Sequence, residues 1–243
     1  MHGKAKLALF CVAVVLAWGV TARAEFFKET FDSYASGSQM HGQGGWKGWD
    51  NSPSAGALVT NTRSSSAPNS VIITGSSDLV HEWTGLTSGR WEVSTMQFIP
   101  FGPTGTTYFI LLNQYKDATG PDNWSVQIPF NLSTGTVSDD MVPDPKPTLS
   151  LVKNQWVRLA ADINLDTDTV DFYYNGTLLS THPWRNNDPN ASQEIKAIDL
   201  FANGTPMVYY DDLVIRQIPE PSFWCLLVTG LVALGLVARR RRR

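Results

Sequence analysis

Two tryptophans, Trp46 and Trp49, lie in a Gly- and Ser-rich stretch between residues 36 and 54. A tryptophan ring is large, flat and mostly apolar, and a Gly-rich loop offers it little core to enter. Such a ring can stack on the C–H face of a pyranose, so we expect both side chains to be partly exposed sugar contacts. The alternative is that both rings fold down as a lid on the core.

The histidines and carboxylates show no spacing typical of a catalytic site. Neither Gly-x-Ser-x-Gly nor His-Glu-x-x-His occurs, and His41, His81 and His182 have no paired spacing. We therefore expect a protein without catalytic activity that binds carbohydrate, with a purely structural surface protein as one alternative. A second alternative, a divergent polysaccharide hydrolase or lyase, stays open.

Alternating apolar and polar residues predict strands through most of the chain. Residues 91–99 and 124–128 alternate as a half-buried strand does, and residues 108–112 form the apolar run of a strand covered on both faces. Within residues 155–182, Asn175-Gly176 predicts a tight hairpin turn. About ten short strands with Gly and Pro turns predict an all-β, two-sheet antiparallel β-sandwich over residues 25–218.

Three segments of this region resemble the concanavalin A-like or laminin G-like jelly roll. They are residues 27–32 (FKETFD, its opening strand), 154–157 with 173–176 (NQWV and YYNG, its central hairpin) and 209–215 (YYDDLVI, its closing strand). The resemblance implies that fold, which serves glycosidases, polysaccharide lyases and binding modules. The Glu-x-Asp-x-x-Glu strand of the jelly-roll glucanases is missing, and the Gln-Ile-His motif of the alginate lyases is replaced by Gln127-Ile128-Pro129.

The same resemblance implies a calcium ion between the first and last strands, with Glu29, Asp32, Asp211 and Asp212 as candidate ligands. Calcium takes about six to eight oxygen ligands. Because side chains alternate along a strand, only one of Asp211 and Asp212 can point inward, where a carboxylate is costly unless paired or metal-bound. Both aspartates can instead be solvated at the strand edge. A polar turn at residues 162–168 is a weaker candidate for the ion.

The composition of the region between the two end segments indicates which kinds of partner it can bind. Three of the 19 basic residues precede Glu25 and five follow Ala238, which leaves 11 Lys and Arg against 21 Asp and Glu, a net charge of −10. This acidic balance argues against nucleic acid as a partner. Cys11 and Cys225 lie in the end segments, so the region between them has no internal disulfide. We expect at least half of its seven tryptophans to fill the core.

The N-terminus has the three zones of a secretory signal peptide. Lys4 and Lys6 precede an apolar run over residues 7–20, and small residues, Ala22 and Ala24, flank Arg23. That order predicts cleavage by signal peptidase after Ala24. The alternative is an uncleaved anchor, for which the run is short, because a transmembrane helix needs roughly 20 apolar residues.

The C-terminus also has three parts in order. Pro219-Glu220-Pro221 is followed by an uncharged apolar run over residues 223–238 and by five arginines, Arg239, Arg240, Arg241, Arg242 and Arg243. The run predicts a transmembrane helix in the inner membrane, and the arginines predict that its end stays in the cytoplasm. The region before it then lies outside that membrane.

This tail resembles the PEP-CTERM sorting signal of exported bacterial proteins. The resemblance implies processing at Pro219-Glu220-Pro221 by an exosortase-type transpeptidase, after transient anchoring in the inner membrane. The expected destination is the cell surface or the extracellular matrix, with exopolysaccharide as a partner. The domains predicted are a signal peptide (1–24), a jelly-roll sandwich (25–218) and a sorting tail (219–243). A plain single-span anchor is the alternative.

Overall fold

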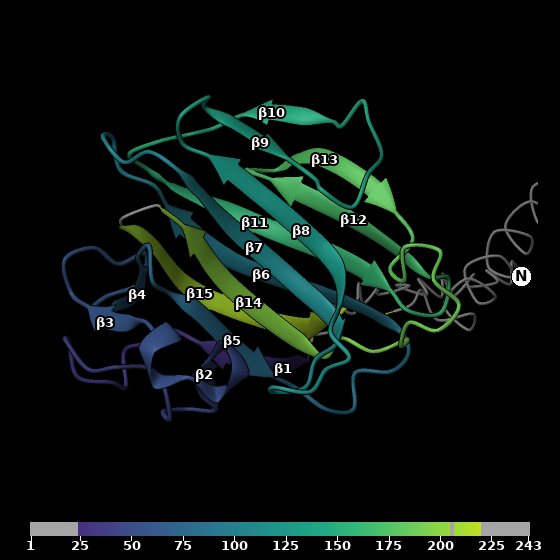
Figure 1. Cartoon of the computed structure of the whole chain (residues 1–243), viewed down its shortest axis with the longest axis horizontal. Helices are drawn as coiled ribbons and strands as arrows, with labels where there is room; N and C mark the ends of the chain where they lie inside the picture. The colour runs from purple at the N-terminus through teal and green to yellow at the C-terminus, as the bar shows by residue number, and fades with distance from the viewer. Residues whose placement is uncertain (1–23, 205–206, 220–243) are drawn as a thin grey trace, which may run out of the picture.

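The computed structural model describes residues 24–204 and 207–219. These residues form two antiparallel β-sheets that face each other as a sandwich (Figure 1), with two short 3₁₀ helices, η1 (Trp49–Asn51) and η2 (Pro53–Ala55). The prediction of an all-β, two-sheet antiparallel fold is confirmed. No helix within the described residues is long and apolar enough to span a membrane, and the predicted transmembrane run lies outside them.

One sheet has eight strands. In spatial order they are β13 (Thr177–His182), β12 (Thr169–Tyr174), β11 (Trp156–Asn164), β6 (Arg90–Phe98), β15 (Val208–Gln217), β4 (Ser70–Ile73) and β3 (Leu58–Thr60), with β1 (Glu25–Glu29) also paired to β15. The long strand β15 pairs with β6 on one side. On its other side it pairs first with β4 and then with β1. The first and last strands of the domain are therefore neighbours.

The other sheet has seven strands. In spatial order they are β10 (Thr148–Ser150), β9 (Thr136–Ser138), β8 (Asn123–Asn131), β7 (Thr106–Gln114), β14 (Ala197–Asn203), β5 (Asp78–Glu82) and β2 (Trp46–Gly48). The strands β2, β3, β9 and β10 have three residues each and were not predicted, because three residues are too few to show an alternation.

The core lies between the two sheets. Leu79, Phe109 and Leu200 point inward from the seven-stranded sheet and are fully or almost fully buried. Phe109 meets Phe172 of the eight-stranded sheet, with ring centroids 5.7 Å apart. Because side chains alternate along a strand, the neighbours of the inward residues must point away from the core. The residues that alternate with these core residues therefore form the outward face of the seven-stranded sheet.

The hairpin turn and the tryptophans are two local features for which the sequence made a prediction. Asn175 and Gly176 have φ values of 49° and 78°, the positive pair that a type I′ turn needs. Of the seven tryptophans between the two end segments, only Trp46, Trp83 and Trp184 are buried. Trp91 is partly buried and packs against the same core, so four of the seven contribute to it, in agreement with the expectation that at least half do.

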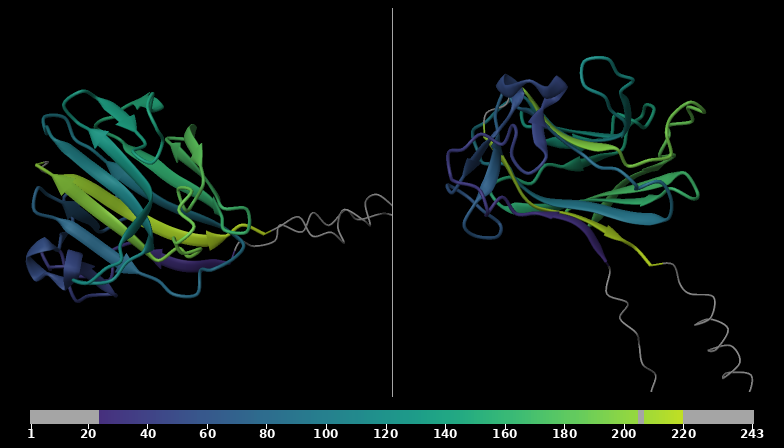
Figure 2. Two further views of the ribbon diagram at one scale, coloured as in Figure 1. Left: turned by 45° about the vertical axis from the view of Figure 1, so that its right-hand side comes forward. Right: turned by 90° about the horizontal axis from the view of Figure 1, so that it is seen from below.

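The two ends of the described domain leave it side by side (Figure 2). The backbone N–H of Gln217 donates to the carbonyl oxygen of Ala24 over 3.2 Å, and Glu25 pairs with Arg216. Ala24 and Pro219 are both exposed. The predicted signal-peptide cleavage point and the first residue of the predicted sorting motif thus lie at the same end of the sandwich. Residues 1–23 and 220–243 lie outside the described residues.

Candidate functional site

A groove of about 300 Å³ opens on the outward face of the seven-stranded sheet. Its lining residues come from η1 and from four neighbouring strands; they are Trp49, Asp78, Tyr108, Ile110, Trp124, Gln127, Asp199 and Phe201. The register explains the grouping: Asp199 lies opposite Ile110, and Phe201 lies opposite both Tyr108 and Asp78. The volume is at the lower end of the range for small-molecule sites.

Two pairs of aromatic rings line the groove. Trp49 and Trp124 have nearly parallel rings, 11° apart in plane and 6.3 Å between centroids. Tyr108 and Phe201 stack at 26° and 5.5 Å. Trp124 is 37% exposed, which is unusual for so large an apolar side chain. The groove therefore presents flat apolar faces to solvent.

Trp49 is held over the sheet by its own loop. The backbone N–H of Asp50 donates to the hydroxyl of Tyr115, and the Trp49 ring packs edge-on against that of Tyr115 at 4.8 Å. Gly48 allows the tight bend that brings Trp49 there, since a Cβ at Gly48 would meet the carbonyl oxygen of Ser52 at 2.0 Å. The position of Trp49 is therefore fixed before any ligand arrives.

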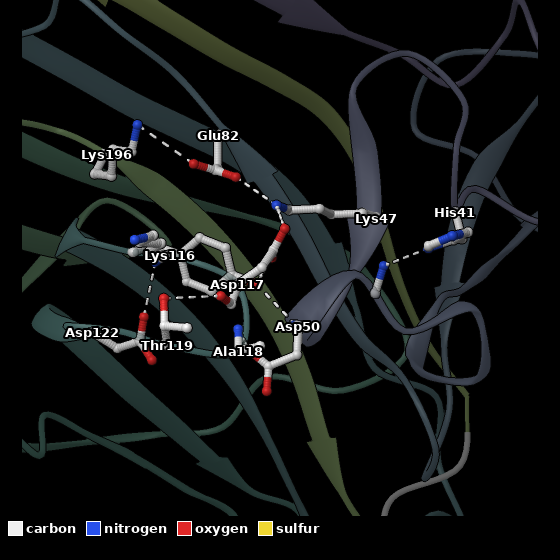
Figure 3. A network of polar contacts seen from close by, with 12 residues as sticks. His41, Lys47, Asp50, Glu82, Lys116, Asp117, Ala118, Thr119, Asp122 and Lys196 are labelled. Atoms are coloured by element: carbon white, nitrogen blue, oxygen red, sulfur yellow. Dashed lines mark hydrogen bonds and ion pairs between the residues drawn. The ribbon is translucent and has the colours of Figure 1, made fainter.

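A charged network anchors this loop to the sheet (Figure 3). Lys47 Nζ lies 2.6 Å from both Glu82 and Asp117, and Lys196 lies 3.4 Å from Glu82. Burial opposes the charge of Lys47, but its hydrogen bonds to Asp117 and Glu82 raise its pKa overall. The Tyr115 hydroxyl also donates to Asp117. Each charge in this network has an opposite partner, so the network is structural.

Asp78 and Asp199 occupy the floor of the groove without such partners. Asp199 is 3% exposed, and in the part of the chain that the structure describes no Lys, Arg or His forms an ion pair with either carboxyl. Oδ1 of each residue is buried and has no hydrogen-bond partner among the described residues. Asp199 is therefore buried at the floor of the groove, with half-buried Asp78 beside it.

The pKa values of both carboxyls are raised. Burial raises the pKa of Asp199 well above its usual value, and the charge of Asp78 and the hydrogen bond between the two raise it further. Burial also raises the pKa of Asp78, while the hydrogen bond with Asp199 acts in the opposite direction. Ionisation of both carboxyls together is therefore unfavourable, because two adjacent carboxylates repel each other where burial limits screening by water.

A third polar cluster joins the edges of the two sheets. Asp139, which follows β9 and is fully buried, accepts a hydrogen bond from Ser180 Oγ and lies 3.2 Å from His182 Nε2. Burial would lower the pKa of His182, but the hydrogen bond and charge of Asp139 raise it overall. The Ser180 hydroxyl is directed at the carboxylate and not at the imidazole, so these residues are not arranged as a Ser–His–Asp triad.

The structure separates the two tryptophans that the sequence placed together. Trp49 is partly exposed and lines the groove, in agreement with the expectation for it. Trp46 is 1% exposed and packs against Phe31 and His81, so the exposure expected of it is wrong. Trp46 pairs with His81 in β5, and this register turns its side chain inward and that of Lys47 outward.

The four predicted calcium ligands engage neighbouring groups of the protein. Glu29 accepts from the Phe31 N–H, Asp32 from the Asn69 N–H, and Asp211 from the N–H groups of Ser65 and Ser66; the Ser66 hydroxyl donates to Asp212. No group of three or more Asp, Glu, His or Cys side chains among the described residues is arranged to hold a metal ion. Calcium binding stays a prediction.

Asp211 and Asp212 differ in burial, and a β-bulge interrupts the regular alternation of β15 between Asp211 and Val214. Asp211 is fully buried and its pKa is raised to about 6, mainly by burial, whereas Asp212 is partly exposed with a φ of 50°. The buried carboxylate of Asp211 accepts from three backbone N–H donors, those of Ser65, Ser66 and Asp212. Its neighbour Tyr210 belongs to the core between the sheets, so Asp211 is buried on the other face of β15, under the segment that carries Ser65 and Ser66, and does not point into the core.

The sequence did not single out most of the groove residues. Tyr108 and Trp124 fell within predicted strands, but nothing indicated that they share an outward face. One signal was present: Asp199 interrupts the apolar run of β14, Ala197–Asn203, and a carboxylate in such a run needs a partner or a function.

No family model and no curated protein matches the sequence. Among solved structures, the chain is similar to the T. cruzi calreticulin globular domain, with 11% identity and a TM-score of 0.55 over 89% of this chain and 100% of that domain. A sialidase matches with 10% identity and a TM-score of 0.51, over 82% of this chain and 18% of its own length. A Trypanosoma rangeli sialidase matches with 12% identity and a TM-score of 0.49, over 68% of this chain and only 27% of its own length. Similarity at these identities concerns the β-sandwich fold alone.

Proposed function

We propose that this chain is a non-catalytic carbohydrate-binding protein of the bacterial cell envelope or matrix. The observation that carries the proposal is the groove on the seven-stranded sheet, where the parallel rings of Trp49 and Trp124 lie beside Tyr108 and Phe201. A pyranose ring has an apolar C–H face and polar hydroxyl edges. Flat aromatic faces with a polar floor complement both parts.

Two features make the groove rigid before binding. Hydrogen bonds and the ion pairs of Lys47 hold the loop that carries Trp49, and Trp124 is part of the long strand β8. Little conformational entropy is then lost when a sugar binds, which favours affinity.

Hydrolysis is the second candidate, because the carboxyl pair Asp78 and Asp199 has raised pKa values inside a groove. The spacing argues against it. Glycosidases that use two carboxylates hold them about 5 Å apart or more, so that the anomeric carbon or a water fits between them. Asp78 and Asp199 are diagonal neighbours on β5 and β14 and interact directly, and their Oδ1 atoms are buried, which does not suit two carboxylates placed on either side of a substrate bond. Binding is therefore the better-supported role.

Export and sorting remain part of the proposal. The predicted signal peptide and PEP-CTERM-like tail lie outside the described residues, and the exposed positions of Ala24 and Pro219 at one end of the sandwich suit access by processing enzymes. Mass spectrometry of the mature protein from its native host tests this. A C-terminus that still ends at Arg243 in most molecules would contradict processing.

A glycan array probed with the full-length chain in mild detergent tests the binding function. We expect binding to one class of polysaccharide, and a loss of about tenfold or more in affinity for Trp124→Ala, since burying an aromatic face contributes at least about 1.4 kcal/mol. Phe101→Ala is the matched control, because Phe101 is 70% exposed and does not line the groove. Equal binding by both variants would contradict the assignment, and release of reducing ends would favour the hydrolase.

A further inference from the structure

The carboxyl pair at the floor of the groove distinguishes this site from a general sugar platform. Asp199 is almost fully buried, lines the groove, and has one carboxyl oxygen without a partner among the described residues. Oδ1 of Asp78 is likewise buried and has no hydrogen-bond partner among the described residues. A buried oxygen without a donor is costly. The carboxyl pair that lines the groove therefore contains two buried acceptor atoms to which no described residue donates.

The groups that face the pair add no positive charge. Asp50, on the loop that carries Trp49, is a further carboxylate whose charge raises the pKa of Asp78. On the β8 side, Gln127 donates to Asp140, whose charge is neutralised by Lys146 at 2.7 Å. Tyr108 and Tyr210 are neutral hydroxyls with raised pKa values, chiefly because they are buried. Any cation at this floor must come from outside the described domain.

We propose that the groove selects saccharides that carry a protonated amino group, and that this ammonium group bonds to the carboxyl pair Asp78 and Asp199. The proposal rests on the carbohydrate-binding function proposed above and names its substrate class. An ammonium group has three N–H donors, so it can bond to both carboxylates at once. The aromatic walls stabilise a cation through their ring faces.

The proton balance follows from the exchange. A proton that the carboxyl pair holds in the free site leaves to solvent when the ammonium group binds, so that the complex holds two carboxylates and one ammonium. Binding therefore weakens as the pH falls, because protons compete for the pair, and weakens again at alkaline pH as the amine loses its charge. The acidic surface of the domain, with its net charge of −10, adds long-range attraction for a polycationic sugar chain.

Three oligosaccharides test the proposal, because they share a β-1,4-linked backbone and differ only at C2: oligomers of glucosamine, of N-acetylglucosamine and of glucose. Their affinities for the full-length chain in mild detergent are measured by calorimetry. We expect the glucosamine oligomer to bind roughly ten- to hundredfold more tightly than the glucose oligomer, the factor that a charge-assisted hydrogen bond contributes. We also expect release of a proton on binding.

The variants Asp199→Asn and Asp78→Asn should each reduce that affinity ratio by about tenfold. Their melting curves establish that each is folded, and either variant is sufficient for the test. Glu25→Gln is the control, because it removes one exposed carboxylate from the other sheet and leaves the groove intact. The ratio should survive in this variant.

The failures are distinguishable. If none of the three oligomers binds and the glycan array is also negative, the carbohydrate-binding function is wrong and this proposal falls with it. If the oligomers bind with equal affinity, the groove binds sugars but the selectivity for amines is wrong. If the preference survives in both Asn variants and disappears in high salt, it is bulk attraction to an acidic surface, which also overturns the proposal.

Discussion

Buried carboxyl groups lie on the outward faces of both sheets, and the two sites differ in whether cationic side chains pair with them. On the eight-stranded sheet, the carboxylate of Glu92 is only 8% exposed and lies between the guanidinium groups of Arg158 and Arg216. On the seven-stranded sheet, Asp78 and Asp199 lie in a groove with no cation among the described residues. The buried carboxylate of Glu92 is paired with two cations, whereas the carboxyl pair in the groove has none among the described residues.

This difference separates a structural polar cluster from a binding site. A carboxylate held by two arginines has no remaining need for a ligand. A carboxyl pair without a cationic partner can accept a cationic donor from a ligand, and the free-energy cost of burying such a pair is typical of functional sites. Removing charge from each site should therefore change stability in opposite directions.

The largest effect is expected at the satisfied site. Glu92→Gln should lower the free energy of unfolding by about 2 kcal/mol, because two guanidinium groups lose a buried anionic partner. Both arginines are partly exposed, which keeps the loss below that for a fully buried pair. A thermal melt of the full-length chain should show a decrease of several degrees. A melt unchanged from the wild type would show that this cluster is not structural.

The opposite sign is expected at the groove. Asp199→Asn should raise the free energy of unfolding by about 1 kcal/mol at pH 7, because the amide donates to Asp78 as the protonated acid does, without the cost of burying a second ionisable group. The same melting experiment measures it, with Glu25→Gln as a control that should melt as the wild type does. A destabilised Asp199→Asn variant would show that the pair contributes to folding and not to binding.

The stabilising effect should depend on pH, and its sign follows from the raised pKa of Asp199. Above the unfolded pKa of about 3.9, the folded wild type binds more protons than the unfolded chain, so its stability falls as the pH rises through this window. The Asn variant lacks this loss. Melting temperatures measured between pH 7 and pH 4 should therefore converge, with the smallest difference at the acid end. A difference that grows toward acid pH would contradict the raised pKa.

The sequence predicted the fold better than the site, for a physical reason. Alternation in β6 and β8 and the Asn175-Gly176 turn are local properties, and they identified the strands and a hairpin correctly. Which face of a strand points outward depends on its pairing with strands far away in the sequence. The apolar run of β7 therefore gave no sign that Tyr108 and Ile110 face a groove.

Trp46 and Trp49 show the same limit within a single loop. They share composition, neighbourhood and spacing, yet Trp46 is buried and Trp49 lines the groove. The difference arises from the pairing of the three-residue strand β2 with β5 and from the positive φ of Asp50, which starts a new chain direction after Trp49. Neither feature has a distinct pattern in the sequence.

The most direct test of the groove as the binding site is hydroxyl-radical footprinting of the full-length chain, with and without a saturating amount of the tightest-binding oligosaccharide from the array. Trp124 and Phe101 are both exposed aromatic side chains, and only Trp124 lines the groove. We predict that the sugar slows oxidation of Trp124 and Trp49 and leaves that of Phe101 unchanged. Equal oxidation of Trp124 in the free and saturated protein would contradict the central claim.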